Sequence, residues 1–143
     1  MLPALWNVAL KEWSATVDAL ARGDQVFILR KGGIREDNRQ FKIQYDQFFL
    51  YPTVFHESNE WLKSGKSELI SLNSMEEYED KITLSVFAEI EEVIEVRKDT
   101  ELKALEPFHI WSQDFVYKRL NWKPRYALNL ILLRCHLLRL LRL

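Results

Sequence analysis

The sequence predicts an α+β domain in which a curved, mostly antiparallel sheet carries an N-terminal amphipathic helix. Two patterns predict this class. Apolar residues recur at spacings of three and four before Gly23, and apolar residues stand at every even-numbered position from Ile82 to Ile90. Short apolar runs bounded by Gly or Pro lie between these two segments, as expected of further strands. One form that such a sheet takes is a small open barrel.

The composition indicates a single domain over residues 1–143, with its core at about 5–135 and a Leu/Arg-rich tail at 137–143. Hydrophobic residues make up 48% of the chain and charged residues 29%, as in ordinary globular proteins. The lone Cys135 excludes an intramolecular disulfide and favours a reducing, cytoplasmic location. Charged residues interrupt the apolar stretch 126–143, so a soluble protein without a membrane-spanning helix is expected.

The N-terminal half is expected to contain one long helix and several short strands. The helix ends before Gly23, and its apolar stripe consists of Trp6, Ala9, Leu10, Trp13, Val17 and Leu20. Strands are predicted at 26–29, 41–45, 48–51 (ended by Pro52) and 69–72, and short helices at 56–63 and from 74, where Ser74 and Glu77 have capping-box spacing.

The alternation at 82–90 predicts a strand that buries its even-numbered side chains and turns Thr83, Ser85 and Glu89 towards solvent. Glu92 interrupts the even-numbered pattern, which predicts a bulge or bend nearby. A helical turn at 100–105, an extended segment at 108–111, a helix from Ser112 to Leu120 and a loop at 121–125 follow. Residues 126–133 fit either a helix or a strand buried on both faces, and their position after a Pro-containing loop favours the strand.

Charge is distributed unevenly along the chain. Residues 76–101 hold ten acidic and three basic residues, so this segment carries −7 and the remainder +6 of an overall −1. The positive charge gathers near residues 30–35, 118–125 and 134–142. This distribution is compatible with a basic binding face and equally with two ordinary solvated faces.

Residues 30–35, Arg-Lys-Gly-Gly-Ile-Arg, form the strongest candidate site. Adjacent glycines allow backbone N–H groups to turn towards an anion, and the cations add charge-assisted contacts. Thr53 and His56 follow the strand at 48–51, and Gly33 and His56 are predicted to share a pocket. The alternative is a strand-ending turn with solvated cations. The predicted ligand-binding residues are Arg30, Lys31, Gly32, Gly33, Arg35, Thr53, His56, Arg119 and Lys123.

No catalytic residue can be assigned from the sequence, and no metal or cofactor is expected. His56 and Glu60 would share a helix face, but a zinc protease needs a second histidine at that position. The triplets Glu79-Asp80-Lys81 and Glu101-Leu102-Lys103 fit the acidic-x-Lys pattern of metal-dependent nucleases, at about the frequency that random placement gives. Glu12 fits a partly buried carboxylate, a surface acid or the partner of a cation, and the five tryptophans fit core or groove walls better than base-stacking platforms.

Three blocks of this sequence resemble the prokaryotic family called domain of unknown function 1802. They are residues 9–13 (Ala-Leu-Lys-Glu-Trp), residues 29–35 around Gly32-Gly33, and residues 48–56 around Tyr51-Pro52-Thr53; a segment like 109–124 usually accompanies them. The resemblance spans roughly residues 5–135. Family members typically close with an Arg-Val-Tyr-like strand, where this chain has Arg134-Cys135-His136 and then leucines and arginines. The family name implies no activity.

A weaker similarity points to the PUA-like barrels, in particular ASCH domains. Gly23 and Arg30 match the spacing of that pattern, but Gln25, Val26 and Ile28 stand at its Lys, Thr and Glu positions. This similarity implies at most a related fold. Three functions follow as hypotheses: non-catalytic binding of a phosphate-bearing ligand or nucleic acid through a basic face, a metal-dependent nuclease of the PD-(D/E)xK type, and a protein–protein adaptor.

Overall fold

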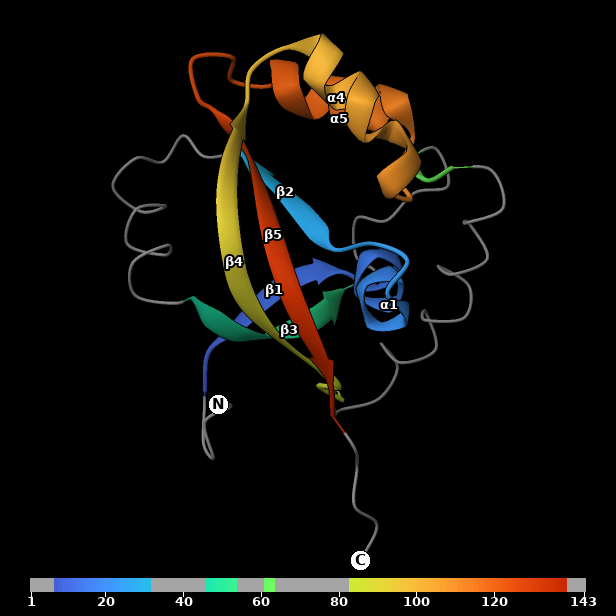
Figure 1. Ribbon diagram of the computed structural model, residues 1–143, viewed down its shortest axis with the longest axis vertical. Helices are drawn as coiled ribbons and strands as arrows, with labels where there is room; N and C mark the ends of the chain where they lie inside the picture. Colours follow the sequence, from blue (N-terminus) through green and yellow to red (C-terminus); the bar gives the residue numbers. More distant parts are fainter. Residues whose placement is uncertain (1–6, 32–45, 54–60, 64–82, 139–143) are drawn as a thin grey trace, which may run out of the picture.

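A five-stranded sheet in the order β1-β3-β4-β5-β2 organises the protein (Figure 1). The structure, a computed structural model, describes residues 7–31, 46–53, 61–63 and 83–138. β1 pairs with β3 in parallel, whereas the β3–β4, β4–β5 and β5–β2 pairs are antiparallel. The predicted α+β class with an open, mostly antiparallel sheet is confirmed. The strands are β1 (Ala9–Trp13), β2 (Phe27–Lys31), β3 (Gln47–Thr53), β4 (Val86–Val96) and β5 (Leu128–Leu137).

The helices form two groups, one beside the sheet and one beyond an end of β4 and β5 (Figure 1). They are α1 (Ser14–Arg22), α4 (Asp99–Leu105), the 3-10 helix η3 (Glu106–Phe108) and α5 (Gln113–Asn121). α1 lies beside β1 and β3, and α4 and α5 lie together beyond the other end of β4 and β5 (Figure 1). Within the described ranges, no helix combines the length and apolar character needed to cross a membrane.

The first helix begins at Ser14, so the prediction of a helix from Trp6 was wrong over residues 9–13. Those residues form β1, whose register with β3 runs from Ala9 opposite Phe49 to Trp13 opposite Thr53. Sheet pairing overrides local helix propensity here, because each residue of the pair gains a backbone partner outside its own segment. The predicted end of the helix is confirmed: Gly23 adopts a left-handed φ of 78° and caps α1.

β4 contains the predicted irregularity. Ile90 pairs with Leu133 and Glu92 with Leu132, so Glu91 is the extra residue of a β-bulge. Before the bulge, Val86, Ala88 and Ile90 pack towards the core beneath α1; after it, the odd-numbered Val93 takes over that face. The strand begins at Val86, later than predicted.

Burial along β4 follows the prediction only in part. Val86 and Ala88 are buried and Thr83 is exposed, as predicted, whereas Ser85 and Glu89 are half-buried. The odd-numbered Phe87 is also buried, because it packs edge-on against Phe49 of the neighbouring strand with 5.1 Å between ring centroids.

β5 is a strand buried on both faces, which confirms the preferred interpretation of residues 126–133. Leu128 and Leu130 join a core beneath α4 and α5, whereas Ile131 and Leu133 join the core beneath α1. Because both faces are covered, apolar residues follow one another without alternation. The strand continues to Leu137, the first residue of the predicted tail, and residues 139–143 of that tail lie outside the described residues.

The C-terminal helices agree with the sequence. Ser112 caps α5 by accepting a hydrogen bond from the Phe115 N–H at 3.2 Å, and Pro107 lies in η3 directly after α4. The predicted extended segment 108–111 is wrong at Phe108, which ends η3, while Trp111 forms a bridge with Leu62. The elements predicted at 41–45, 69–72 and 74 onwards, and most of 56–63, lie outside the described residues.

Candidate functional site

The end of β2 carries two cations that point to opposite faces of the sheet, as successive strand residues do. The Arg30 guanidinium donates to the backbone carbonyl of Lys11 and, at 2.9 Å, to the carboxylate of Glu12, both in β1. The Lys31 ammonium donates to the carbonyl of Leu120 in α5. β2 thereby contacts β1, the opposite edge strand, through Arg30, and it contacts α5 through Lys31.

Glu12 is the counter-ion of this site. Its side chain is only 10% exposed, and its second carboxylate oxygen accepts a hydrogen bond from the Trp13 N–H at 2.9 Å. The hydroxyl of Thr53 donates to the Glu12 carbonyl at 3.4 Å, because parallel pairing places Thr53 opposite Trp13. Glu12 is therefore both a largely buried carboxylate and the partner of a cation, two of the roles that the sequence left open.

Arg119 completes the group from α5. Burial is the main cause that lowers its pKa; the positive charge of Arg30 lowers it further, and Glu12 opposes the shift. The pKa of Lys31 is likewise lowered, first by burial and then by the charge of Arg119. Arg30, Lys31, Arg119 and Glu12 are called the seam cluster below: Arg30 and Arg119 lie near the Glu12 carboxylate, and Lys31 lies near Arg119.

Aromatic packing fixes α5 against this cluster. Trp13 stacks on Trp61 with 4.7 Å between ring centroids and an interplanar angle of 14°, and Phe115 lies 4.7 Å from Trp13. The Arg119 guanidinium lies 5.2 Å from the centre of the Phe115 ring. Trp61 is held in turn because its carbonyl accepts a hydrogen bond from the Ser112 N–H at 2.7 Å. The expectation that tryptophans build the core holds for the buried Trp111 and, in part, for this stack.

The loop after α5 carries an exposed tryptophan, in contrast to the packed rings of Trp13 and Trp61. Trp122 is 51% exposed, with the Arg119 guanidinium 5.8 Å and the Lys123 ammonium 4.7 Å from its ring centre. Lys123 has a positive φ of 47°, and the Tyr126 N–H closes the turn onto its carbonyl at 2.9 Å. Arg125 lies 4.9 Å from the Tyr126 ring. Residues 121–126, called the basic–aromatic loop below, thus join two aromatic rings to neighbouring cations.

The structure brings together part of the site predicted from the sequence. Arg30, Lys31 and Arg119 meet in the seam cluster, Thr53 touches it through the Glu12 backbone, and Lys123 adjoins it through Trp122. Gly32, Gly33, Arg35 and His56 lie outside the described residues, as does the predicted pocket shared by Gly33 and His56. The basic–aromatic loop was missed as a unit, although the alternation of cations and aromatic rings at 119–126 was visible in the sequence.

The acidic-x-Lys triplet at 101–103 lies on a helix. Glu101 accepts hydrogen bonds from the N–H groups of Arg97 and Lys98 at 3.0 Å each and so caps α4, while Leu102 is fully buried. The triplet at 79–81 lies outside the described residues. In the ranges that the structure describes, no three His, Cys, Asp or Glu side chains gather as metal ligands would.

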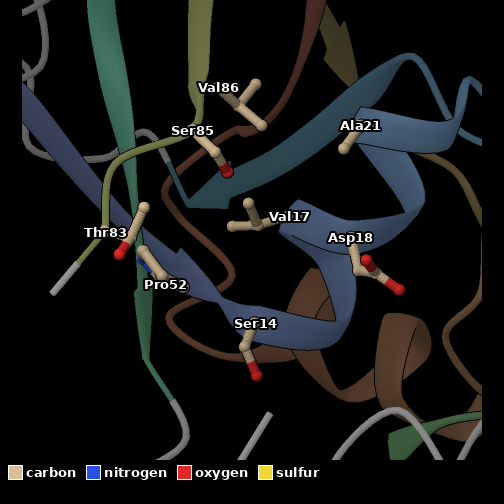
Figure 2. Close-up of a pocket in the computed structure, with 8 residues that line it drawn as sticks. All are labelled: Ser14, Val17, Asp18, Ala21, Pro52, Thr83, Ser85 and Val86. Carbon is tan, nitrogen blue, oxygen red and sulfur yellow. The ribbon is translucent and has the colours of Figure 1, made fainter. Parts of the chain in front are cut away.

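A separate pocket of about 140 Å³ lies between α1, the end of β3 and the start of β4 (Figure 2). Ser14, Thr83 and Ser85 supply hydroxyl groups, and Val17 and Val86 supply apolar surface. The Asp18 carboxylate points away from the valines (Figure 2) and pairs with Arg22 at 2.7 Å. Because its lining residues include no cation, this pocket does not suit an anion, and the seam cluster stays the better candidate.

Comparison with known proteins finds one family. The family described as a domain of unknown function (DUF1802) matches residues 9–141. The match includes all the strands and helices described above and every residue of the seam cluster. No curated protein and no solved structure matches this chain.

Proposed function

The chain belongs to the family described as domain of unknown function 1802, and we propose that it is a non-catalytic module that binds a phosphate-bearing ligand, such as a nucleic acid, at the seam cluster. The observation that carries the proposal is the gathering of three cations, in which Arg30 and Arg119 lie near the Glu12 carboxylate and Lys31 lies near Arg119. The proposal places this binding in the reducing cytoplasm, in keeping with the single cysteine.

The lowered pKa values of Lys31 and Arg119 support an anionic ligand. Part of each shift comes from repulsion by a neighbouring cation, so the cluster holds its positive charges at an energetic cost. A phosphate group placed among them would reduce this repulsion and accept charge-assisted hydrogen bonds. A neutral ligand would do neither, and a cation would increase the repulsion.

The test is binding of inorganic polyphosphate to the wild type and to Arg119→Gln, measured by calorimetry at several salt concentrations. A charge-assisted contact of roughly 1.5–3 kcal/mol predicts affinity lower by about 10- to 150-fold in the variant. Binding to the wild type should fall steeply with salt. Unchanged affinity in Arg119→Gln would contradict the proposal.

Arg134→Gln is the matched control, because it removes the same charge elsewhere on the sheet. Arg30 pairs with Asn129, and Arg134 lies five residues further along β5, or about 16 Å at ~3.3 Å per residue. Its guanidinium pairs with Glu91 at 2.7 Å and is 65% exposed. Polyphosphate affinity should stay within about twofold of the wild type. Mg²⁺-dependent cleavage of an oligonucleotide would instead favour a nuclease, and no binding to any polyanion would favour an adaptor.

A further inference from the structure

The basic–aromatic loop points to the class of the ligand. We propose that Trp122 is a stacking platform for a base of single-stranded nucleic acid, whose phosphates are bound by Lys123 and by the seam cluster. This inference rests on the proposed function, because the seam cluster supplies the phosphate contacts and the loop adds base contacts.

The exposure of Trp122 is the first support. An indole is a large apolar group, yet Trp122 stays about half exposed to water although it directly follows α5, which packs on the core. Among the described residues, Val26, Ile94, Phe108 and Leu137 are also exposed. Trp122 is distinguished by the two cations that lie over its ring. A ring that is both exposed and bordered by cations suits a ligand that carries flat bases and negative charge together.

The backbone of the loop is the second support. Lys123 has φ of 47°, a conformation that residues with a Cβ atom rarely adopt. In this turn, closed by the hydrogen bond from the Tyr126 N–H to the Lys123 carbonyl, the Lys123 ammonium lies over the Trp122 ring, 4.7 Å from its centre. The cation and the ring are therefore already adjacent before a ligand arrives. An unfavourable backbone conformation is typical of binding sites.

Continuity with the seam cluster is the third support. Arg119 lies against both Phe115 and Trp122 and is near enough to Arg30 for their charges to interact, so it connects the platform to the seam cluster. A strand with one base on Trp122 could continue its backbone along Arg119 towards Arg30. Duplex nucleic acid would not suit this surface, because its bases are already stacked on one another and the Trp122 ring cannot reach their faces.

The experiment measures fluorescence anisotropy of labelled 15-nucleotide oligo(dT) and oligo(U), a blunt duplex of the same length, and competition by inorganic polyphosphate. Trp122→Leu should weaken oligonucleotide binding by about 5- to 100-fold, the range of one lost base stack. Its affinity for polyphosphate should stay within about twofold. Trp122→Phe, which retains an aromatic face, should fall between the wild type and Trp122→Leu. Phe108→Leu is the matched control, since Phe108 is a 60% exposed aromatic residue on η3.

The outcomes separate this inference from the proposed function. If Trp122→Leu binds the oligonucleotides as tightly as the wild type while Arg119→Gln loses both ligands, the stacking platform is wrong and the phosphate site stands. Duplex binding as tight as single-strand binding would also overturn the inference. If the wild type binds neither polyphosphate nor oligonucleotide, both proposals fail. Unchanged melting temperatures of the Trp122 variants, expected for an exposed side chain, would exclude misfolding as the cause of lost binding.

Discussion

The guanidinium of Arg30 lies 2.9 Å from the carboxylate of Glu12, so an ion pair joins β2 and β1, the two edge strands of the described sheet. Arg30 also donates to the Lys11 carbonyl, which engages the β1 backbone. In a closed barrel, backbone hydrogen bonds between neighbouring strands would span this gap. Here a side chain spans it, and the same side chain belongs to the proposed binding site.

Arg30→Lys should separate the two roles of Arg30. A lysine keeps the charge but lacks the planar guanidinium, whose Nη2 donates to both Lys11 and Glu12. We expect the free energy of unfolding to fall by about 1–2 kcal/mol, measured by urea denaturation, with polyphosphate affinity within about threefold of the wild type. Arg30→Ala should lose both stability and affinity. Equal stability of Arg30→Lys and the wild type would show that the contact across the edges contributes little.

Glu12→Gln should strengthen anion binding while it weakens the fold. The change removes the negative charge near Arg30 and Arg119 but keeps an amide oxygen as acceptor for Arg30. Without that charge, we expect polyphosphate to bind roughly three- to tenfold more tightly and the unliganded protein to melt at a lower temperature. Calorimetry and thermal melts with and without polyphosphate check this. Unchanged polyphosphate affinity would show that the charge of Glu12 does not act on the bound ligand.

Gln25→Ala should destabilise the protein by about 1–3 kcal/mol. The buried Gln25 amide accepts a hydrogen bond from the Ile110 N–H at 3.0 Å and donates to the Phe27 carbonyl at 2.8 Å, so it connects the start of β2 to the segment before α5. Truncation would leave buried backbone groups without a partner. The exposed neighbour Asp24 provides the control: Asp24→Ala should change the free energy of unfolding, measured in urea, by less than about 0.5 kcal/mol.

Trp13→Ala should cost about 3–5 kcal/mol of stability, because the ring stacks on Trp61 and packs at a tilt against Phe115. Chemical denaturation measures this cost. Trp13→Phe retains part of the stack and should cost less. If Trp13→Ala left the melting temperature unchanged but abolished ligand binding, the ring would belong to a ligand groove and not to the core.

His109 should make stability depend on pH in the acidic range. Burial is the main cause that lowers its pKa from 6.5 to about 4. The unfolded chain therefore binds a proton more readily, and the stability present above pH ~6.5 is lost as pH falls through 4. His109→Phe removes this titration and keeps a ring against Phe27 and Trp111. Between pH 7 and pH 4, the wild type should lose up to about 3 kcal/mol more than the variant in urea denaturation.

The sequence predicted the fold better where the hydrophobic pattern was simple. The bulge near Glu92 and the cap at Ser112 were predicted because each leaves a local signature, a break in alternation or a capping residue. β1 was mistaken for a helix because Glu12 occupies a position that faces inwards, where a strand pattern would have an apolar residue. A charged residue on the inward face of a strand interrupts the alternation of apolar and polar residues. Here that residue is Glu12, which belongs to the candidate binding site.

The sequence predicted individual residues of the candidate site but not how they come together. Arg30 and Lys31 were chosen for their charge and neighbouring glycines, but their meeting with Arg119 depends on β2 pairing with β5 and on α5 packing beside Trp13. Such contacts join segments about ninety residues apart, as in the hydrogen bond from Lys31 to Leu120, and no local pattern encodes them. The exposure of Trp122 could not be predicted for the same reason.

The central place of β5 has a consequence for synthesis of the protein on the ribosome. β5 lies between β4 and β2 and is the last of the described strands to be translated. Until residues 128–137 emerge, the edges of β2 and β4 that face β5 have no partner, and the apolar side chains of both strands remain open to other nascent chains. Pairing across such long sequence separations is slow. The growing polypeptide should therefore depend on chaperones late in translation, and truncation before Leu128 should give aggregates.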